Sequence, residues 1–342
     1  MSSTDSLVIL SVLMPFLASF LNFVLRNLEN VRDAVTFFLS LITFGFVLLI
    51  LKDFISGKQI DFSLIEIMPG IDIGFKIEPL GMLFSVVASG LWIVTHIYAI
   101  GYMRNNEENN QARFFACFSI AIGTVLGLAF SKNLFTLFLF YELLTISTFP
   151  LVAHKGTADA LSGAKTYLAI LLGTSVGFQL VAIIWVYFLA GTLEFTLQGI
   201  LQGKVTNFQA SVLLALFAFG IGKAALMPFH RWLPAAMVAP TPVSALLHAV
   251  AVVKAGVFTI LKVGIYIFGI DFLRETGVSN WLVWLATFSV LSASIIAMTK
   301  DNLKARLAYS TVSQLSYITL GVALANSLGV LGGSLHIATH AL

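Results

Sequence analysis

The chain has 342 residues, of which 58% are hydrophobic and 10% are charged, and its mean hydropathy is +0.96. A soluble domain carries roughly 25% charged residues, so this composition excludes a soluble enzyme, a disordered tail and a nucleic-acid-binding protein. The net charge of +3 is too small to indicate a polyanionic partner, and the single cysteine, Cys117, excludes an internal disulfide and a cysteine-held metal cluster.

Long apolar runs predict an all-α integral membrane protein. A helix of about 20 apolar residues crosses a bilayer, and backbone groups in lipid must bond within their own helix. We expect about eleven transmembrane helices, centred on Leu7–Leu25, Ala34–Leu51, Pro79–Tyr102, Phe114–Phe130, Leu134–Val152, Ala164–Ala190, Ala210–Leu226, Pro240–Phe268, Trp281–Met298, Leu307–Ala325 and Leu328–Leu342. The first run is too long for a signal peptide and no Lys or Arg precedes it, so we expect it to be retained.

The connections between these runs are short. The longest polar stretches are Lys52–Lys76 and Arg104–Gln111. Basic residues favour an N-terminus outside the cell, because the inner connections then hold more Lys and Arg than the outer ones. We therefore expect a multi-pass protein of a bacterial-type inner or plasma membrane. The last run stops at Leu342 without a cap or a charged anchor, so we expect a C-terminally incomplete chain.

Three ionisable residues lie well inside apolar runs: Glu142, Lys223 and Lys254. Each costs at least about 2.5–3.5 kcal/mol at the centre of a bilayer, so each needs a reason to be there. One interpretation is a structural ion pair that locks two helices together. One glutamate with two lysines leaves a lysine without a carboxylate. Burial opposes the charge on that lysine and a nearby carboxylate favours it, which is the property that a proton relay requires.

Two histidines lie close to these lysines along the chain. His248 precedes Lys254 by about 9 Å of helix, and His230 follows Lys223 by one heptad. Imidazole titrates near pH 6.5 and has a nitrogen on each side of its ring, so it can receive and pass a proton. We therefore place both histidines in the candidate relay.

Other polar residues receive simpler interpretations. We expect His96 to be an ordinary hydrogen-bonding residue, and Lys262 to be an anchor that reaches the membrane surface. Lys165 is equally compatible with a surface anchor and with a polar interior. His336 and His340 have a spacing that could chelate a metal, but no third ligand accompanies them, so we predict no metal site.

The seventh and eighth runs are interrupted. Gly220 and Gly222 stand directly before Lys223, and four prolines follow within Pro228–Pro242. Proline removes a backbone donor, and irregular backbone at membrane depth survives only where it faces protein or a water-filled cavity. Discontinuous helices with ionisable residues are typical of ion-transport folds, although an ordinary re-entrant connection has the same pattern.

Three stretches now resemble the antiporter-like subunits of respiratory complex I. They read YELLTISTFPLVAHKG, GKAALMPFHRWLPAAMVAPTPVSALLHAVAVVKAG and KARLAYSTVSQLSY followed by HIATHAL. The same family includes the large subunits of Mrp-type sodium/proton antiporters and subunits of membrane-bound hydrogenases. The resemblance covers nearly the whole chain and is weakest over the first three runs.

The resemblance implies a fold of fourteen helices with two inverted five-helix repeats and a broken seventh helix. It divides this chain into N-terminal transmembrane helices 1–3 (residues 1–110), a first antiporter-like repeat of helices 4–8 with a half-channel (111–270), and a partial second repeat of helices 9–11 (271–342). The chain stops before the twelfth helix, which carries an essential Lys or Glu in the family.

The resemblance also implies roles for individual residues. Glu142 and Lys223 match the glutamate of the fifth helix and the lysine of the broken seventh helix, which pair in the family. His248 and Lys254 match the proton-carrying positions of the eighth helix, and His230 matches the histidine of the His-x-Trp-Leu-Pro element. Together they would form a Glu–Lys switch and a Lys/His proton relay, with no cofactor and no metal.

Two departures from the family bear on function. Ala235 stands where the family often has Asp, so one polar bridge is missing. The sixth run reads KTYLAILLGTSVGF and lacks the arginine of the complex I members, which favours the antiporter branch.

The implied function is proton translocation as an antiporter-like subunit of a complex I-type NADH:quinone oxidoreductase or a related complex. Its partners would be other membrane subunits, the lipid bilayer and protons, with Na⁺ as a second candidate ion. The chain has no nucleotide-binding loop, flavin fingerprint or cysteine ligand set, so we expect no redox centre of its own. Two alternatives remain open: an A/D-like subunit of a multisubunit monovalent cation (Na⁺)/H⁺ antiporter, and a structural scaffold subunit.

Overall fold

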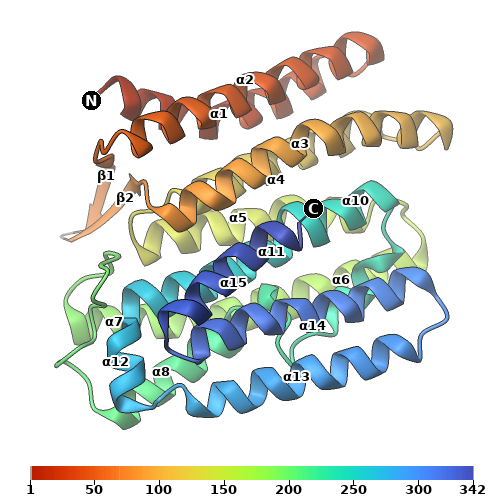
Figure 1. The fold of residues 1–342 in the computed structure, drawn as a ribbon. Coiled ribbons are helices and arrows are strands. Elements are labelled where there is room, and N and C mark those ends of the chain that lie inside the picture. The colour runs from red at the N-terminus through yellow and green to blue at the C-terminus, as the bar shows by residue number, and fades with distance from the viewer. Residues whose placement is uncertain (1, 69, 342) are drawn as a thin grey trace.

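The computed structural model describes residues 2–68 and 70–341, except for the side chain of His248. Long helices lie side by side in layers, with the N-terminal pair at one edge of the molecule and the pair α13–α14 at the other (Figure 1). The helices of the first half are α1 (Ser3–Val24), α2 (Glu29–Ile55), α3 (Pro79–Asn105), α4 (Gln111–Ala129) and α5 (Leu134–Val152).

The sixth predicted run forms one long helical segment that widens in its middle. It consists of α6 (Ala158–Thr174), the π-helix η1 (Ser175–Gln179) and α7 (Leu180–Ala190). Near the C-terminus lie α12 (Ile270–Thr276), α13 (Asn280–Met298), α14 (Leu303–Ala323) and α15 (Ser327–Thr339).

Between these two groups the chain is repeatedly broken, as the glycines and prolines predict. The pieces are α8 (Asn207–Gly220), the 3₁₀ turn η2 (Gly222–Ala224), α9 (Trp232–Ala235), the 3₁₀ turn η3 (Ala236–Val238), α10 (Thr241–Ala245), the π-helix η4 (Leu246–Val250), α11 (Val252–Lys262) and the π-helix η5 (Val263–Phe268). Proline cannot donate a backbone hydrogen bond. Pro228 accordingly lies in the gap before α9 and Pro240 at the N-cap of α10, while Pro234 and Pro242 lie in first turns, where amides have no helical acceptor.

The predicted all-α membrane architecture is confirmed. Each of the eleven predicted runs contains helix, and among the described residues seven helices are long and apolar enough to cross a bilayer. The bent pair Val252–Phe268 and Ile270–Thr276 brings the number to eight. The other three predicted spans are shorter or less apolar than these helices. Helices α8 and α15 are short, and α14 carries basic residues and many hydroxyl groups.

Side-chain caps set the ends of several helices. The Ser2 hydroxyl accepts a hydrogen bond from the Asp5 amide at the start of α1, and the Asn133 side chain accepts one from the Thr136 amide at the start of α5. Asn326 caps α15 through the amide of Gly329 in the same way. These bonds satisfy backbone donors that have no partner inside the helix, and so fix where each helix begins.

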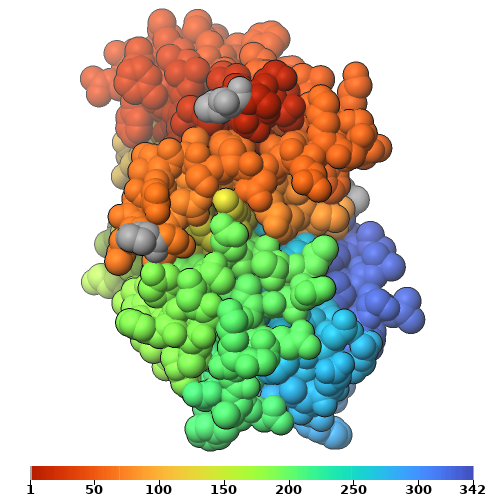
Figure 2. All heavy atoms as spheres, turned by 90° about the vertical axis from the view of Figure 1, so that its left-hand side faces the viewer, coloured from red at the N-terminus to blue at the C-terminus, as the bar shows by residue number. Residues whose placement is uncertain are grey.

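A β-hairpin occupies the polar stretch between α2 and α3, where the sequence predicts only a connection. Strands β1 (Asp61–Met68) and β2 (Ile71–Lys76) pair antiparallel. The alternation of isoleucines with polar residues in this stretch is typical of β-strands. Figure 2 shows the hairpin on the same face of the molecule as the green segment that follows α7.

Lys132 ties the hairpin to the helical bundle. Its Nζ lies 3.3 Å from Asp61, 3.6 Å from Asp72 and 3.3 Å from Glu194. Partial burial by itself lowers the pKa of Lys132, but these three carboxylates outweigh that effect, so the pKa lies above its usual value of 10.5. A single lysine thus joins β1, β2 and the segment after α7.

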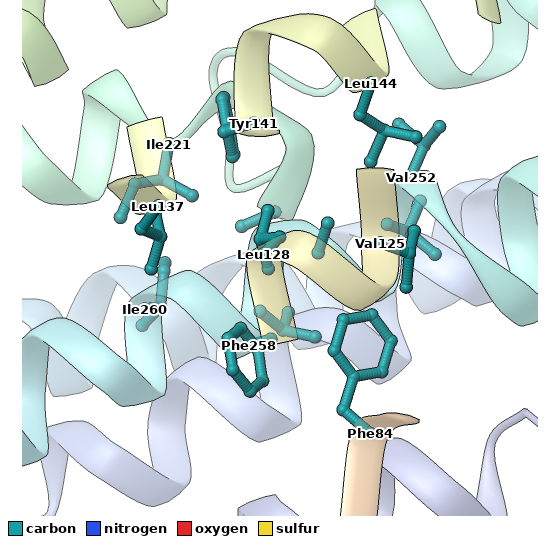
Figure 3. Packing of buried hydrophobic residues seen from close by; sticks show 14 of the residues in the cluster. Phe84, Val125, Leu128, Leu137, Tyr141, Leu144, Ile221, Val252, Phe258 and Ile260 are labelled. Atoms are coloured by element: carbon teal, nitrogen blue, oxygen red, sulfur yellow. The ribbon is translucent and has the colours of Figure 1, made fainter. Parts of the chain in front are cut away.

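The centre of the molecule is α11, in which every residue is buried. Val252 of this helix lies beside Leu144 of α5 and Val125 of α4, and Phe258 lies beside Phe84 of α3 and Leu128 of α4 (Figure 3). The rings of Phe84 and Phe258 lie 5.0 Å apart between centroids. A helix that carries two lysines and exposes no residue belongs inside such a bundle rather than against lipid.

Gly256 lets α11 touch the broken segment. A Cβ atom on this residue would lie 2.3 Å from the carbonyl carbon of Lys223 and 2.2 Å from the amide nitrogen of Ala224. Only glycine permits this approach, because both contacting atoms belong to the backbone. The eighth predicted span is therefore in direct contact with the backbone at Lys223.

We expect Gly256→Ala to lower the free energy of unfolding by about 1–3 kcal/mol, because the added methyl group must push α11 away from the broken segment. Thermal unfolding of the purified protein in detergent measures this loss. Gly45→Ala is the matched control, since a Cβ there meets nothing within 4 Å. Equal stability of the two variants would contradict the close approach.

We expect the stabilising contribution of Lys132 to be complete below pH 10.5 and to be lost as the pH rises through its raised pKa, because the neutral amine no longer attracts the carboxylates. The stability of the protein in detergent, followed from neutral to strongly alkaline pH, should therefore fall less steeply for Lys132→Met than for the parent protein. Lys58→Met, which removes an exposed pair with Asp53, serves as the control. Identical slopes for the parent and Lys132→Met would refute this role.

Candidate functional site

Lys223 lies at the break that follows α8, and its side chain is completely buried. Its Nζ donates hydrogen bonds to the carbonyl oxygen of Tyr141 at 2.8 Å and to the hydroxyl of Thr145 at 2.6 Å. The same Nζ lies 3.2 Å from the centroid of the Tyr141 ring. Neutral oxygens and the face of an aromatic ring thus surround the ammonium group, and each of them favours a positive charge.

The break itself is held by aromatic residues. The Lys223 amide donates to the Tyr141 hydroxyl at 3.2 Å, and the Trp232 indole donates to the Gly222 carbonyl at 2.8 Å. The Trp232 ring also packs edge-on against Tyr167 of α6. These contacts replace helical hydrogen bonds that the break removes, and so they keep the ammonium group of Lys223 at a fixed place.

Glu142 follows Tyr141 on α5 but does not reach Lys223. In the part of the chain that the structure describes, no ion pair joins the two residues, and neither carboxylate oxygen of Glu142 has a hydrogen-bond partner although both are buried. Helix geometry explains the separation. Tyr141 and Thr145 are four residues apart and share the face of α5 that receives Lys223, whereas Glu142 is turned about 100° away from Tyr141.

Lys254 lies in the first turn of α11 and is also completely buried. Its Nζ donates a hydrogen bond to Nδ1 of His340, at the end of α15. The His340 ring stacks on that of His336, with centroids 6.0 Å apart, and Nε2 of His336 lies 2.8 Å from the side-chain oxygen of Gln314 on α14. A line of polar groups therefore runs from α11 through α15 to α14.

This line of groups is not predicted from the sequence. There His336 and His340 stand out only as a possible metal-chelating pair, because their four-residue spacing puts both on one face of a helix. The same spacing stacks the two rings and turns His340 toward Lys254. Nothing in the sequence indicates that α15 ends beside the start of α11.

The two predicted relay histidines have different outcomes. His230 lies between η2 and α9, half-buried, with its ring 6.0 Å from that of Tyr309 on α14. Its buried Nδ1 has no partner among the described residues. His248 belongs to η4, and its side chain lies outside the part of the chain that the structure describes. The structure thus brings Lys223 and Lys254 to neighbouring elements and directs His230 toward α14.

Several other buried polar atoms around the broken segments have no partner among the described residues. They include both amide atoms of Gln179, in η1, and the hydroxyl of Ser244, in α10. Buried polar atoms are nearly always bonded to protein or to ordered water. Together with the carboxylate of Glu142 and Nδ1 of His230, these atoms therefore call for water inside this half of the bundle.

Three simpler predictions can also be compared with the structure. His96 lies 3.3 Å from the carbonyl oxygen of Asp33, as expected of an ordinary hydrogen-bonding residue. Lys165 is exposed on α6, which favours the anchor interpretation over a polar interior. The prediction that Lys262 reaches the membrane surface is wrong: its side chain is fully buried and paired with Glu78, a residue that no local pattern connects with it.

Comparison with known proteins gives consistent matches along the chain. A family model described as "NADH:quinone oxidoreductase/Mrp antiporter, TM" matches residues 131–342. A second model, described as "NADH-Ubiquinone oxidoreductase (complex I), chain 5 N-terminus", matches residues 68–115.

Relatives come from both branches of this family. The chain is 32% identical over 282 residues to NAD(P)H-quinone oxidoreductase chain 5 of Picosynechococcus sp., with 79% of this chain and 40% of the relative covered. It is 33% identical over 276 residues to a probable K⁺/H⁺ antiporter subunit of Rhizobium meliloti, with 80% and 27% covered. The chain therefore spans less than half the length of these curated relatives.

Two solved structures share the fold. The Mrp complex from Dietzia sp. superposes with a TM-score of 0.84 at 24% identity, over 98% of this chain and 36% of that one. The membrane-bound sulfane sulfur reductase, an archaeal respiratory membrane complex, gives a TM-score of 0.83 at 24% identity, over 98% and 68%.

Proposed function

The chain belongs to the NADH:quinone oxidoreductase/Mrp antiporter membrane family, and from this premise we propose that it translocates protons as part of an antiporter-like subunit. The observation that carries the proposal is Lys223. It is a fully buried amine at a helix break, held by neutral oxygens and a ring, with an unpaired buried carboxylate on the adjacent helix. In a purely structural ion pair the two charged groups would be in contact, because their attraction offsets the cost of burying them.

We propose that Glu142 and Lys223 form the switch. When the Glu142 side chain turns toward the face of α5 that holds Tyr141 and Thr145, its negative charge stabilises the protonated amine of Lys223. When it turns farther from Lys223, that attraction weakens and the ammonium gives its proton to a neighbouring water molecule. The lysine is left as a neutral amine, which costs less to bury than an ammonium.

The next acceptor in this proposal is Lys254. It lies on α11, which touches the backbone of Lys223 at Gly256. A proton that reaches Lys254 as ammonium can pass to Nδ1 of His340 along the hydrogen bond that joins them. His336 and Gln314 extend the path into α14. His230 and His248, predicted from the sequence, remain candidates for the water-filled part of residues 111–270, the first antiporter-like repeat.

The energy source lies outside this chain. In one version, redox chemistry in partner membrane subunits moves Glu142, as in a complex I-type oxidoreductase. In the other, a gradient of Na⁺ or another monovalent cation drives exchange. The relative named for K⁺/H⁺ antiport, together with the lack of an arginine in the sixth span, favours the second version. Vesicles that carry the complete complex distinguish the two versions. Without electron donors, an imposed cation gradient moves protons only in the exchange version.

We expect Lys223→Met and Glu142→Gln each to reduce proton translocation by about 100-fold, because each removes a group that holds or releases the proton. Acidification of inverted membrane vesicles, read with a pH-sensitive dye, measures the loss. Lys165→Met makes the same change at an exposed lysine of α6 and should leave the rate unaltered. Full activity in both site variants would favour the scaffold interpretation.

We expect His340→Phe to slow translocation as well, because the phenyl ring keeps the stacking on His336 but has no nitrogen to accept a proton from Lys254. The same vesicle measurement applies. Thr339→Val alters the exposed neighbouring position on α15 and is the control. An unchanged rate in His340→Phe would remove α15 from the path while leaving the Glu142–Lys223 switch intact.

A further inference from the structure

A third buried lysine, Lys262, lies in surroundings unlike those of the other two. Its Nζ forms an ion pair with Glu78 at 2.7 Å and donates to the carbonyl oxygen of Ser131 at 3.2 Å. Glu78 immediately precedes α3, and Ser131 follows α4. Three elements that are far apart in the sequence therefore meet at one ammonium group.

Aromatic rings complete the surroundings of Lys262. Its Nζ lies 4.1 Å from the centroid of Phe195, 5.2 Å from that of Tyr266 and 5.9 Å from that of Phe258. Each ring face attracts a cation, and a paired carboxylate attracts it far more. Neither Lys223 nor Lys254 has an ion-pair partner in the described part of the chain. The surroundings of Lys262 thus give its ammonium group a carboxylate partner, whereas those of Lys223 and Lys254 offer neutral partners among the described residues.

Lys262 and Lys254 occupy opposite ends of the same helix. They are separated along α11 by eight residues, about 12 Å, and Gly256 between them packs on the backbone of Lys223. The π-helices η4 and η5 flank α11 on both sides. Such wide turns leave the rotation and the depth of a helix poorly defined by its own hydrogen bonds. The Gly256 contact holds the first half of α11, and the directional contact of Lys262 with Glu78 holds its C-terminal end.

We propose that the Glu78–Lys262 ion pair is a positioning device that fixes the depth and rotation of α11. It thereby sets the place of the Lys254 amine and, through Gly256, the place of the break that carries Lys223. Lys76, one-third exposed and 3.8 Å from the other oxygen of Glu78, holds the carboxylate toward the hairpin side of the molecule. The consequence for transport rests on the proposed function, whereas the positioning itself does not.

The test measures the burial of position 254 directly. In a Cys117→Ser background that carries Lys254→Cys, the full chain in native membranes is treated with a small, charged thiol reagent. Adding Lys262→Met should raise the labelling rate roughly tenfold, because α11 is no longer held and its first turn opens more often. Lys262→Arg keeps the positive charge and should restore the slow rate.

Two controls keep the result interpretable. Glu78→Gln combined with Lys262→Met leaves no unpaired buried charge, so this variant folds even where the single substitution does not, and its labelling should still be fast. Asp271→Asn with Arg274→Gln removes an exposed ion pair on neighbouring α12 and should leave labelling slow. Slow labelling in a folded double variant would overturn the positioning role.

The same substitutions in the chain that retains Lys254 connect positioning to transport. Lys262→Met should reduce proton translocation roughly tenfold and Lys262→Arg should restore it. Fast labelling with normal translocation would confirm the positioning and overturn its link to transport. Failure of the proposed function is seen separately, as unchanged translocation in Lys223→Met and Glu142→Gln, and it leaves the labelling result standing.

Discussion

The cost of burying a positive charge governs the inner half of this protein, and three fully buried lysines meet that cost in three ways. Lys262 has a carboxylate at 2.7 Å. Lys223 has only neutral oxygens and a tyrosine ring, with Glu142 nearby but turned away. Lys254 donates a hydrogen bond to a histidine, His340. Because lipid supplies no solvation, the proposed mechanism assigns to the partner of each lysine the choice between a fixed and an exchangeable proton.

Lys223 reaches its partners because its own segment is not regular helix. The Lys223 amine reaches Tyr141 because α8 ends at Gly220 and the chain turns before Trp232 closes the break. Close packing then transmits the position of one segment to the next, since Gly256 lets α11 rest on the backbone of Lys223. A helix continued through residue 223 would satisfy its own backbone and would leave the amine no route to α5.

Much of the candidate site could be predicted from the sequence, and the reasons for the rest are geometric. Glu142, Lys223 and Lys254 stood out because charge is rare in apolar runs. The absence of a Glu142–Lys223 ion pair from the described residues follows from the rotation of α5, which puts Tyr141 and Thr145 toward the lysine. The prediction that Lys262 is a surface anchor is wrong. It rests on the place of Lys262 near the end of an apolar run, whereas its partner Glu78 lies 184 residues away in the sequence.

The sequence by itself determined that this chain is helical, that it lies in a membrane, that it is broken after Gly220 and that two of its exceptional charges, Lys223 and Lys254, lie in the broken segments. These features follow from local composition, because lipid forces apolar segments into helices and glycine and proline interrupt them. Only the tertiary structure decided which charge meets which partner: Lys262 with Glu78, Lys254 with His340, and Lys223 with Tyr141 and Thr145. Such pairings depend on helix rotation and on contacts between distant segments, neither of which a local pattern contains.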